Sequence, residues 1–143
     1  DKAMLLSKKK AMSLSDQFCV ERHKDTFLNL TKNKLDITFA NEQEIKSLID
    51  TKNFEEVVAF GKQLGRILII TRGENGSVAI KNDDVVECKS KTNLKIVDLT
   101  GAGDLFAAGF LHGFINNYSM KESLEKGTEM SSKIIQKVGA RLN

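Results

Sequence analysis

The stretch Asp98-Leu-Thr-Gly-Ala-Gly-Asp104, followed directly by the apolar run Leu105-Phe-Ala-Ala-Gly-Phe-Leu111, is the most informative part of this 143-residue sequence. Two glycines separated by one alanine allow a sharp turn, and the apolar run predicts a helix over about residues 102–117. The N-terminus of a helix carries a partial positive charge and unpaired N–H groups. The turn therefore predicts an anion site suited to phosphate oxygens.

Asp104 falls in the first turn of this expected helix, beside any bound phosphate. A carboxylate is unfavourable there unless it has a function, and accepting the proton of an attacking hydroxyl is such a function. Alternatively, the aspartate only opposes the helix dipole. The stretch is not GxGxxG, because Phe106 occupies the third glycine position, and the sequence contains no Gly-Lys-Ser/Thr of a Walker P-loop. Residue types alone leave both interpretations of Asp104 open.

Strands are expected to alternate with helices along the rest of the chain. The all-apolar run Ile67–Ile70 is typical of a strand buried on both faces of a parallel sheet. Further strands are expected at 12–14, 36–40, 77–80, 85–87 and 95–97, and helices at 2–11, 25–32, 41–49, 54–64 and 121–137. This alternation predicts an α/β fold with a mainly parallel sheet, in which ligands bind at the carboxyl ends of the strands.

Two shorter motifs follow expected strands. In Asn41-Glu-Gln-Glu44, the first and last residues form either a helix capping box or a pair of side chains that reach one cation–phosphate cluster. In Thr71-Arg-Gly-Glu-Asn-Gly76, the glycines by themselves indicate only a strand–turn–strand connection.

Composition excludes several classes of protein. The 22 basic and 19 acidic residues give a net charge of +3, too small to predict nucleic-acid or membrane binding. Two cysteines and two histidines exclude a disulfide scaffold and a His- or Cys-based metal cluster. The longest apolar stretch is far shorter than the roughly 20 residues that cross a bilayer, and no signal-peptide pattern opens the chain. We expect a soluble, cytoplasmic domain.

The three motifs, in their order along the chain (Asn41–Glu44, Thr71–Gly76, Asp98–Asp104), resemble those of the ribokinase-like carbohydrate and nucleoside kinases, the PfkB family. The resemblance extends over essentially the whole chain. It implies a three-layer α/β/α fold and ATP-dependent phosphoryl transfer. It also implies that Asp104 is the catalytic base and that the amides of Gly101, Ala102 and Gly103 form an anion hole. Leu99 replaces the threonine usual at that position.

The same resemblance implies ligands for the other motifs. Asn41 and Glu44 match an Asn-x-x-Glu motif that positions Mg²⁺, here through water. Thr71, Gly73 and Gly76 match a segment that contacts the nucleotide, in which Gly76 also shapes the turn. Further, Asp98 is implied to help hold a monovalent cation such as K⁺, and Gly139 to border the nucleotide and cation sites.

The resemblance also bears on partners and extent. The expected acceptor is a small-molecule sugar or nucleoside, with a nucleoside slightly favoured, because Ser13–His23 and Gly139–Arg141 look similar to bacterial adenosine-kinase-like members; a homodimer is left open. Kinases of this family are longer, so we expect residues 1–143 to be the C-terminal part of one kinase domain, without the N-terminal lid and acceptor-binding part. Such a chain alone should turn over weakly or not at all.

Two other functions compete with this hypothesis. One is a truncated nucleotide-binding domain without turnover of its own. The other is a Rossmann-type oxidoreductase fragment, against which the absent GxGxxG counts.

Overall fold

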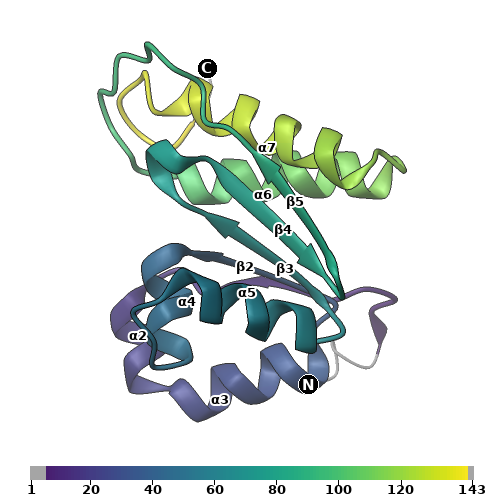
Figure 1. The fold of residues 1–143 in the computed structure, drawn as a ribbon. Coiled ribbons are helices and arrows are strands. Elements are labelled where there is room, and N and C mark those ends of the chain that lie inside the picture. Colours follow the sequence, from purple (N-terminus) through teal and green to yellow (C-terminus); the bar gives the residue numbers. More distant parts are fainter. Residues whose placement is uncertain (1–5, 142–143) are drawn as a thin grey trace. The chain divides into compact units, whose positions relative to one another are not determined.

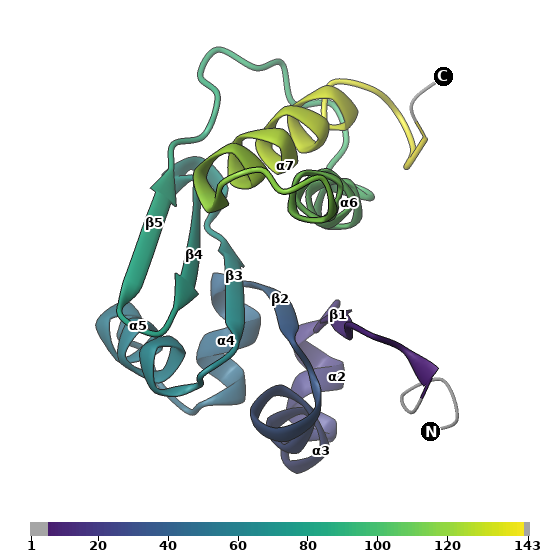
Figure 2. The same ribbon diagram turned by 90° about the vertical axis from the view of Figure 1, so that its right-hand side faces the viewer.

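The computed structural model describes residues 6–141, and its strands form one five-stranded sheet in the order β1-β2-β3-β4-β5 (Figure 2). The elements are β1 (Ala11–Ser13), α2 (Gln17–Arg22), α3 (Lys24–Asn29), a π-helical turn (Leu30–Lys34), β2 (Ile37–Asn41), α4 (Glu42–Leu48), α5 (Phe54–Gln63), β3 (Ile67–Thr71), a 3-10 turn (Gly73–Asn75), β4 (Ser77–Lys81), β5 (Asp84–Cys88), α6 (Ala102–Ile115) and α7 (Met120–Ile134). The chain divides into two compact units, one of residues up to 70 with 80–85, the other of 71–79 and residues from 86 onward.

The first unit is built on buried strands. β1 runs parallel to β2, with Ala11 opposite Ile37. Leu68, Ile69 and Ile70 of β3 are fully buried, which confirms the expectation of a strand covered on both faces. Ile45 of α4 is also fully buried. Burying such a side chain stabilises the fold by about 1.5–3 kcal/mol, so these residues are a main part of the core of this unit.

The second unit contains α6 and α7, which lie side by side (Figure 1). Glycine allows their backbones to approach closely: a Cβ atom built on Gly109 would lie 2.6 Å from the carbonyl oxygen of Lys126. Phe106 and Phe110 are buried, and the rings of Phe110 and Phe114 stack with centroids 6.3 Å apart. The phenylalanines at spacings of four are thus part of the core of this unit.

Two predictions of secondary structure were wrong, the helix at 2–11 and the strand at 95–97. Of the helix expected at 2–11, residues 2–5 lie outside the described residues, while 7–10 are not helical and Ala11 begins β1. The backbone of Lys10 instead pairs with the segment at β2, through its N–H to Asp36 Oδ2 (2.8 Å) and its carbonyl to the Ile37 N–H (3.1 Å). Residues 95–97 form no strand, and the Val97 N–H instead donates to the carbonyl of Ile135 at the end of α7.

Helix α2 was not expected from the sequence. Its N-cap is Asp16, whose carboxylate accepts a hydrogen bond from the Phe18 N–H at 2.6 Å. In the part of the chain between residues 6 and 141, no helix is both long and apolar enough to cross a membrane.

Candidate active site

The glycine turn leads directly into α6, as the sequence predicts. Gly101 is the N-cap residue and has φ +77°, a left-handed conformation that glycine adopts at little cost. The first helical bond runs from the Leu105 N–H to the Gly101 carbonyl at 2.9 Å. Asp104 lies in the first turn and is exposed. A carboxylate therefore stands at a helix N-terminus where solvent or a substrate can reach it.

The three amides expected to form the anion hole are not equivalent. The N–H of Ala102 donates to the Leu99 carbonyl at 3.1 Å, which closes the turn ahead of α6. In this conformation it points back into the turn. An anion held by all three of Gly101, Ala102 and Gly103 requires the Ala102 amide to exchange this bond for one to the ligand.

Asp98 accepts three hydrogen bonds. Its Oδ1 accepts from the N–H (2.9 Å) and hydroxyl (2.7 Å) of Thr100, and its Oδ2 accepts from the Gly139 N–H (2.9 Å). The Thr100 hydroxyl first, and then the Thr100 and Gly139 amides, hold the pKa of Asp98 below its ordinary value. A carboxylate offers about four lone-pair positions, so roughly one remains for a cation. K⁺ would need most of its oxygen ligands from elsewhere, and its binding stays a prediction.

Thr71 ends β3, and the segment after it forms a tight turn. Gly76 donates its N–H to the Gly73 carbonyl (3.1 Å) and accepts from the Arg72 N–H (2.8 Å). Gly76 has φ +86°, and a Cβ there would lie 2.1 Å from the backbone oxygen of Cys88, so only glycine fits. The structure thus confirms that Gly76 shapes the turn, and the expected nucleotide contacts of Thr71, Gly73 and Gly76 stay predictions.

Asn41 and Glu44, which belong to the first unit, form a complete capping box at the start of α4. Asn41 Oδ1 accepts from the Glu44 N–H (2.8 Å), while the Glu44 carboxylate accepts from the Asn41 N–H and Nδ2, each at 2.9 Å. Glu44 is buried; this burial raises its pKa, the Asn41 amide opposes the rise, and the charge of Asp16 adds to it. Each carboxylate oxygen keeps a second lone pair, so Mg²⁺ could be held through water without breaking the box, and its binding stays a prediction.

The remaining candidates, Thr71, Gly73, Gly76, Asp98, Gly101–Asp104 and Gly139, all belong to the second unit. Within it the structure brings together Asp98, Gly101 and Gly139. Sequence reasoning missed Thr100 and Ile135, which fix Asp98. The Asp-x-Thr spacing is a signal for the first, because aspartate commonly bonds the backbone two residues on. No local pattern indicates the second.

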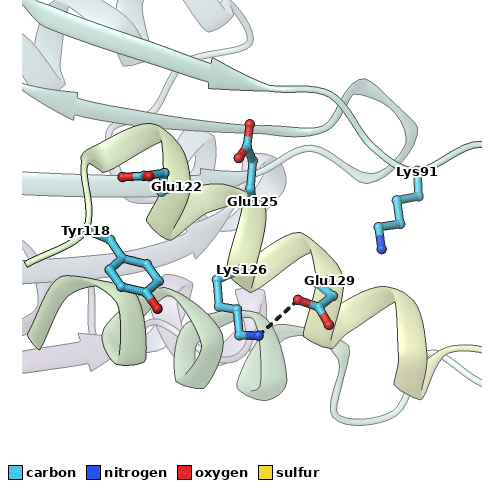
Figure 3. Close-up of a pocket in the computed structure, with 6 residues that line it drawn as sticks. All are labelled: Lys91, Tyr118, Glu122, Glu125, Lys126 and Glu129. Carbon is cyan, nitrogen blue, oxygen red and sulfur yellow. Dashed lines mark hydrogen bonds and ion pairs between the residues drawn. The ribbon is translucent and has the colours of Figure 1, made fainter. Parts of the chain in front are cut away.

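A shallow recess beside α7 contains none of the predicted residues. It is lined by Lys91, Tyr118, Glu122, Glu125, Lys126 and Glu129 (Figure 3). Glu129 pairs with Lys133 (2.5 Å) and Lys126 (3.0 Å), and these two ammonium groups lower its pKa to about 2. Ion pairs along α7 account for the charges of Lys126 and Glu129. Among residues 6–141, no group of three or more His, Cys, Asp or Glu side chains is placed to hold a metal ion.

The comparisons with known proteins agree with the family resemblance of the three motifs. Residues 4–143 match the family model described as pfkB family carbohydrate kinase. The chain is 31% identical over 108 residues to an ATP-dependent 6-phosphofructokinase of Thermoanaerobacterium thermosaccharolyticum and 31% identical over 107 residues to a nucleoside kinase of Methanocaldococcus jannaschii. These alignments cover 75% and 73% of this chain but only 33% and 34% of the relatives.

Solved structures extend the likeness to the fold. A probable sugar kinase from Rhizobium etli (38% identity) and an adenosine kinase from Sinorhizobium meliloti (36%) both superpose with a TM-score of 0.90, covering 94% of this chain and 41% of theirs. A ribokinase from Thermotoga maritima, 20% identical, has the same fold with a TM-score of 0.75. The chain thus spans about a third to just under half of the length of these relatives. Its mainly parallel five-stranded sheet is part of a ribokinase-like α/β domain. The chain belongs to the pfkB family of carbohydrate kinases.

Proposed function

We propose that the protein containing this chain transfers the γ-phosphoryl group of ATP to a hydroxyl of a sugar or nucleoside. The observation that carries the proposal is the placement of Asp104, an exposed carboxylate in the first turn of α6 directly after the left-handed Gly101 turn. Family membership and the relatives named as sugar, nucleoside and adenosine kinases support the reaction class.

Asp104 acts as general base in the proposed reaction. The acceptor hydroxyl gives its proton to the Asp104 carboxylate while its oxygen forms a bond to the γ-phosphorus. The bond between that phosphorus and the β,γ-bridging oxygen breaks, and ADP leaves with the electron pair. General-base assistance of this kind contributes typically about 10²–10⁴-fold to the rate.

The glycine turn stabilises charge on the transferred group. Backbone N–H groups at a helix N-terminus stabilise the charge that develops in the transition state, since they are already oriented before the reaction. We assign this role to the amides of Gly101 and Gly103, and to Ala102 once its N–H leaves the Leu99 carbonyl. Asn41 and Glu44 would hold Mg²⁺ through water, and the ion would neutralise phosphate charge when bound.

We further propose that residues 1–143 form the C-terminal part of a single ribokinase-like kinase domain, in keeping with the fraction of each relative that the chain covers. On this proposal the acceptor-binding part lies outside the chain. A homodimer and a cytoplasmic location stay predictions, testable by sedimentation and by fractionation.

The test is phosphoryl transfer by the complete protein. Purified protein is incubated with Mg²⁺, ATP labelled in the γ-phosphate and a panel of sugars and nucleosides, and labelled product is separated from ATP. We expect label in one or a few acceptors, and label that appears about 10²-fold more slowly in the Asp104→Asn variant. ATP binding with no transfer to any acceptor would instead favour a nucleotide-binding domain without turnover, and NAD binding in place of ATP an oxidoreductase.

A further inference from the structure

The segment after α7 holds the glycine turn at three points. The Gly139 N–H donates to Asp98 Oδ2 at 2.9 Å. The carbonyl of Ile135, at the C-terminal end of α7, accepts from the backbone N–H of Asp98 at 3.2 Å. Ala140 lies directly against Gly101, since a Cβ on Gly101 would come within 2.8 Å of the Ala140 Cβ. The turn therefore rests on residues about 40 positions further along the chain.

Asp98 links both sides of this contact through one carboxylate. Oδ1 accepts from the N–H and the hydroxyl of Thr100, the residue directly before Gly101, while Oδ2 accepts from Gly139. Only Leu99 and Thr100 separate Asp98 from Gly101, so the backbone between the carboxylate and the turn has little freedom. Hydrogen bonds to an ionised acceptor are about twice as strong as neutral ones, so the charge of the Asp98 carboxylate strengthens the bonds to Thr100 and Gly139.

We propose that Asp98 is a positioning residue, whose carboxylate joins the turn to Gly139 and thereby fixes the amides of Gly101 and Gly103 relative to Asp104. The proposal rests on the proposed function, because these amides and Asp104 are the groups assigned to phosphoryl transfer. The role requires no cation and assigns Asp98 a task different from the K⁺ ligation that the family resemblance implies. Misplacing reacting groups by about 1 Å can cost about 10²-fold in rate, so loss of the link should slow turnover strongly.

The first experiment measures the link without any catalysis. Asp98→Asn leaves one carbonyl oxygen, which cannot bond Thr100 and Gly139 together as the carboxylate does. We expect the Gly139 amide of the complete protein to exchange with solvent at least tenfold faster in this variant, measured by NMR or mass spectrometry without ATP. Asp83→Asn, the same charge change in the exposed turn between β4 and β5, is the control and should leave it unchanged. Unchanged Gly139 exchange in Asp98→Asn overturns the proposal.

A second variant tests whether faster exchange comes from loss of the Oδ2 bond and not from general loosening of the turn. Thr100→Val removes the hydroxyl bond to Oδ1 but keeps the Thr100 N–H and the Gly139 bond to Oδ2. We expect faster exchange of Gly139 in Asp98→Asn than in Thr100→Val. Equal exchange in the two variants contradicts a link that runs through Oδ2.

The second experiment separates positioning from cation binding. A positioning role predicts that Asp98→Asn lowers kcat about 10–100-fold, leaves the KM for ATP within about threefold, and stays slow at saturating K⁺. If high K⁺ restores the rate, or if kcat is unchanged, the positioning role is overturned. A wild-type protein that transfers no phosphoryl group defeats the proposed function, whereas the exchange result remains a test of the link by itself.

Discussion

Substituting alanine for Gly101 should destabilise the protein, whereas the same substitution at Gly103 should not. Gly101 has φ +77°, and a left-handed conformation costs an ordinary L-residue about 1–2 kcal/mol. The new Cβ would also lie 2.8 Å from the Ala140 Cβ, well inside the optimal carbon–carbon separation of about 3.5–4.0 Å. Because Ala140 is exposed and can shift, we add about 1 kcal/mol for this contact. Gly101→Ala should therefore lower the free energy of unfolding by about 2–3 kcal/mol.

Gly103 is the matched control. It lies within α6, and a Cβ built on it meets no atom within 4 Å. Removing glycine from a helix gains up to about 1 kcal/mol, so Gly103→Ala should be neutral or stabilising. Urea unfolding followed by circular dichroism gives both free energies. Gly101→Ala within about 0.5 kcal/mol of wild type, or equal losses in the two variants, would refute the reasoning. Both variants should lose turnover, since each places a methyl group on the proposed anion hole.

Two other predictions concern packing and pH. Gly109→Ala would place a Cβ 2.6 Å from the Lys126 carbonyl oxygen and 2.9 Å from the Gly127 Cα, both backbone atoms. The substitution should therefore destabilise the protein by about 1–3 kcal/mol and lower the Tm measured by calorimetry. A Tm equal to that of wild type would show that α6 and α7 do not approach so closely. Burial raises the pKa of Glu44 above 4.5, so this group's stabilising contribution is complete below pH 4.5 and is lost as the pH rises through the raised value. The unfolding free energy of wild type minus that of Glu44→Gln should therefore fall with rising pH over that window, and a difference that rises instead would contradict the shift.

Local pattern was enough to predict several elements. Four consecutive apolar residues at Ile67–Ile70 have no polar face, so a strand there must be covered on both sides, as β3 is. The spacing of Asn41 and Glu44 leaves open a capping box or a pair of cation-binding side chains, and the structure forms both reciprocal bonds of the box. The Gly-Ala-Gly turn followed by the apolar run from Leu105 predicts the start of a helix, and α6 begins at Ala102 as expected.

Other features depend on partners distant in sequence. The β-branched pair Ile96 and Val97 has the local pattern of a strand, yet the Val97 N–H bonds the carbonyl of Ile135 on α7. The π-helical turn after α3, closed by the Leu35 N–H on the Leu30 carbonyl at 3.0 Å, leaves no trace in hydrophobic spacing. Likewise, motif matching assigns Ala102 to the anion hole but cannot show that its N–H faces Leu99. Side-chain type is read from sequence, whereas the direction of an amide follows from the folded backbone.

The central claim is that Asp104 removes the acceptor proton, and Asp104→Asn tests it most directly. The amide keeps the size of the side chain but cannot accept the proton as the carboxylate does. Because Asp104 is exposed and the substitution leaves the Gly101 turn intact, ATP affinity measured by calorimetry should stay within a few-fold of wild type. In the complete protein, the account predicts that kcat for phosphoryl transfer falls by about 10²-fold or more. A variant whose kcat remains within a few-fold of wild type would contradict it.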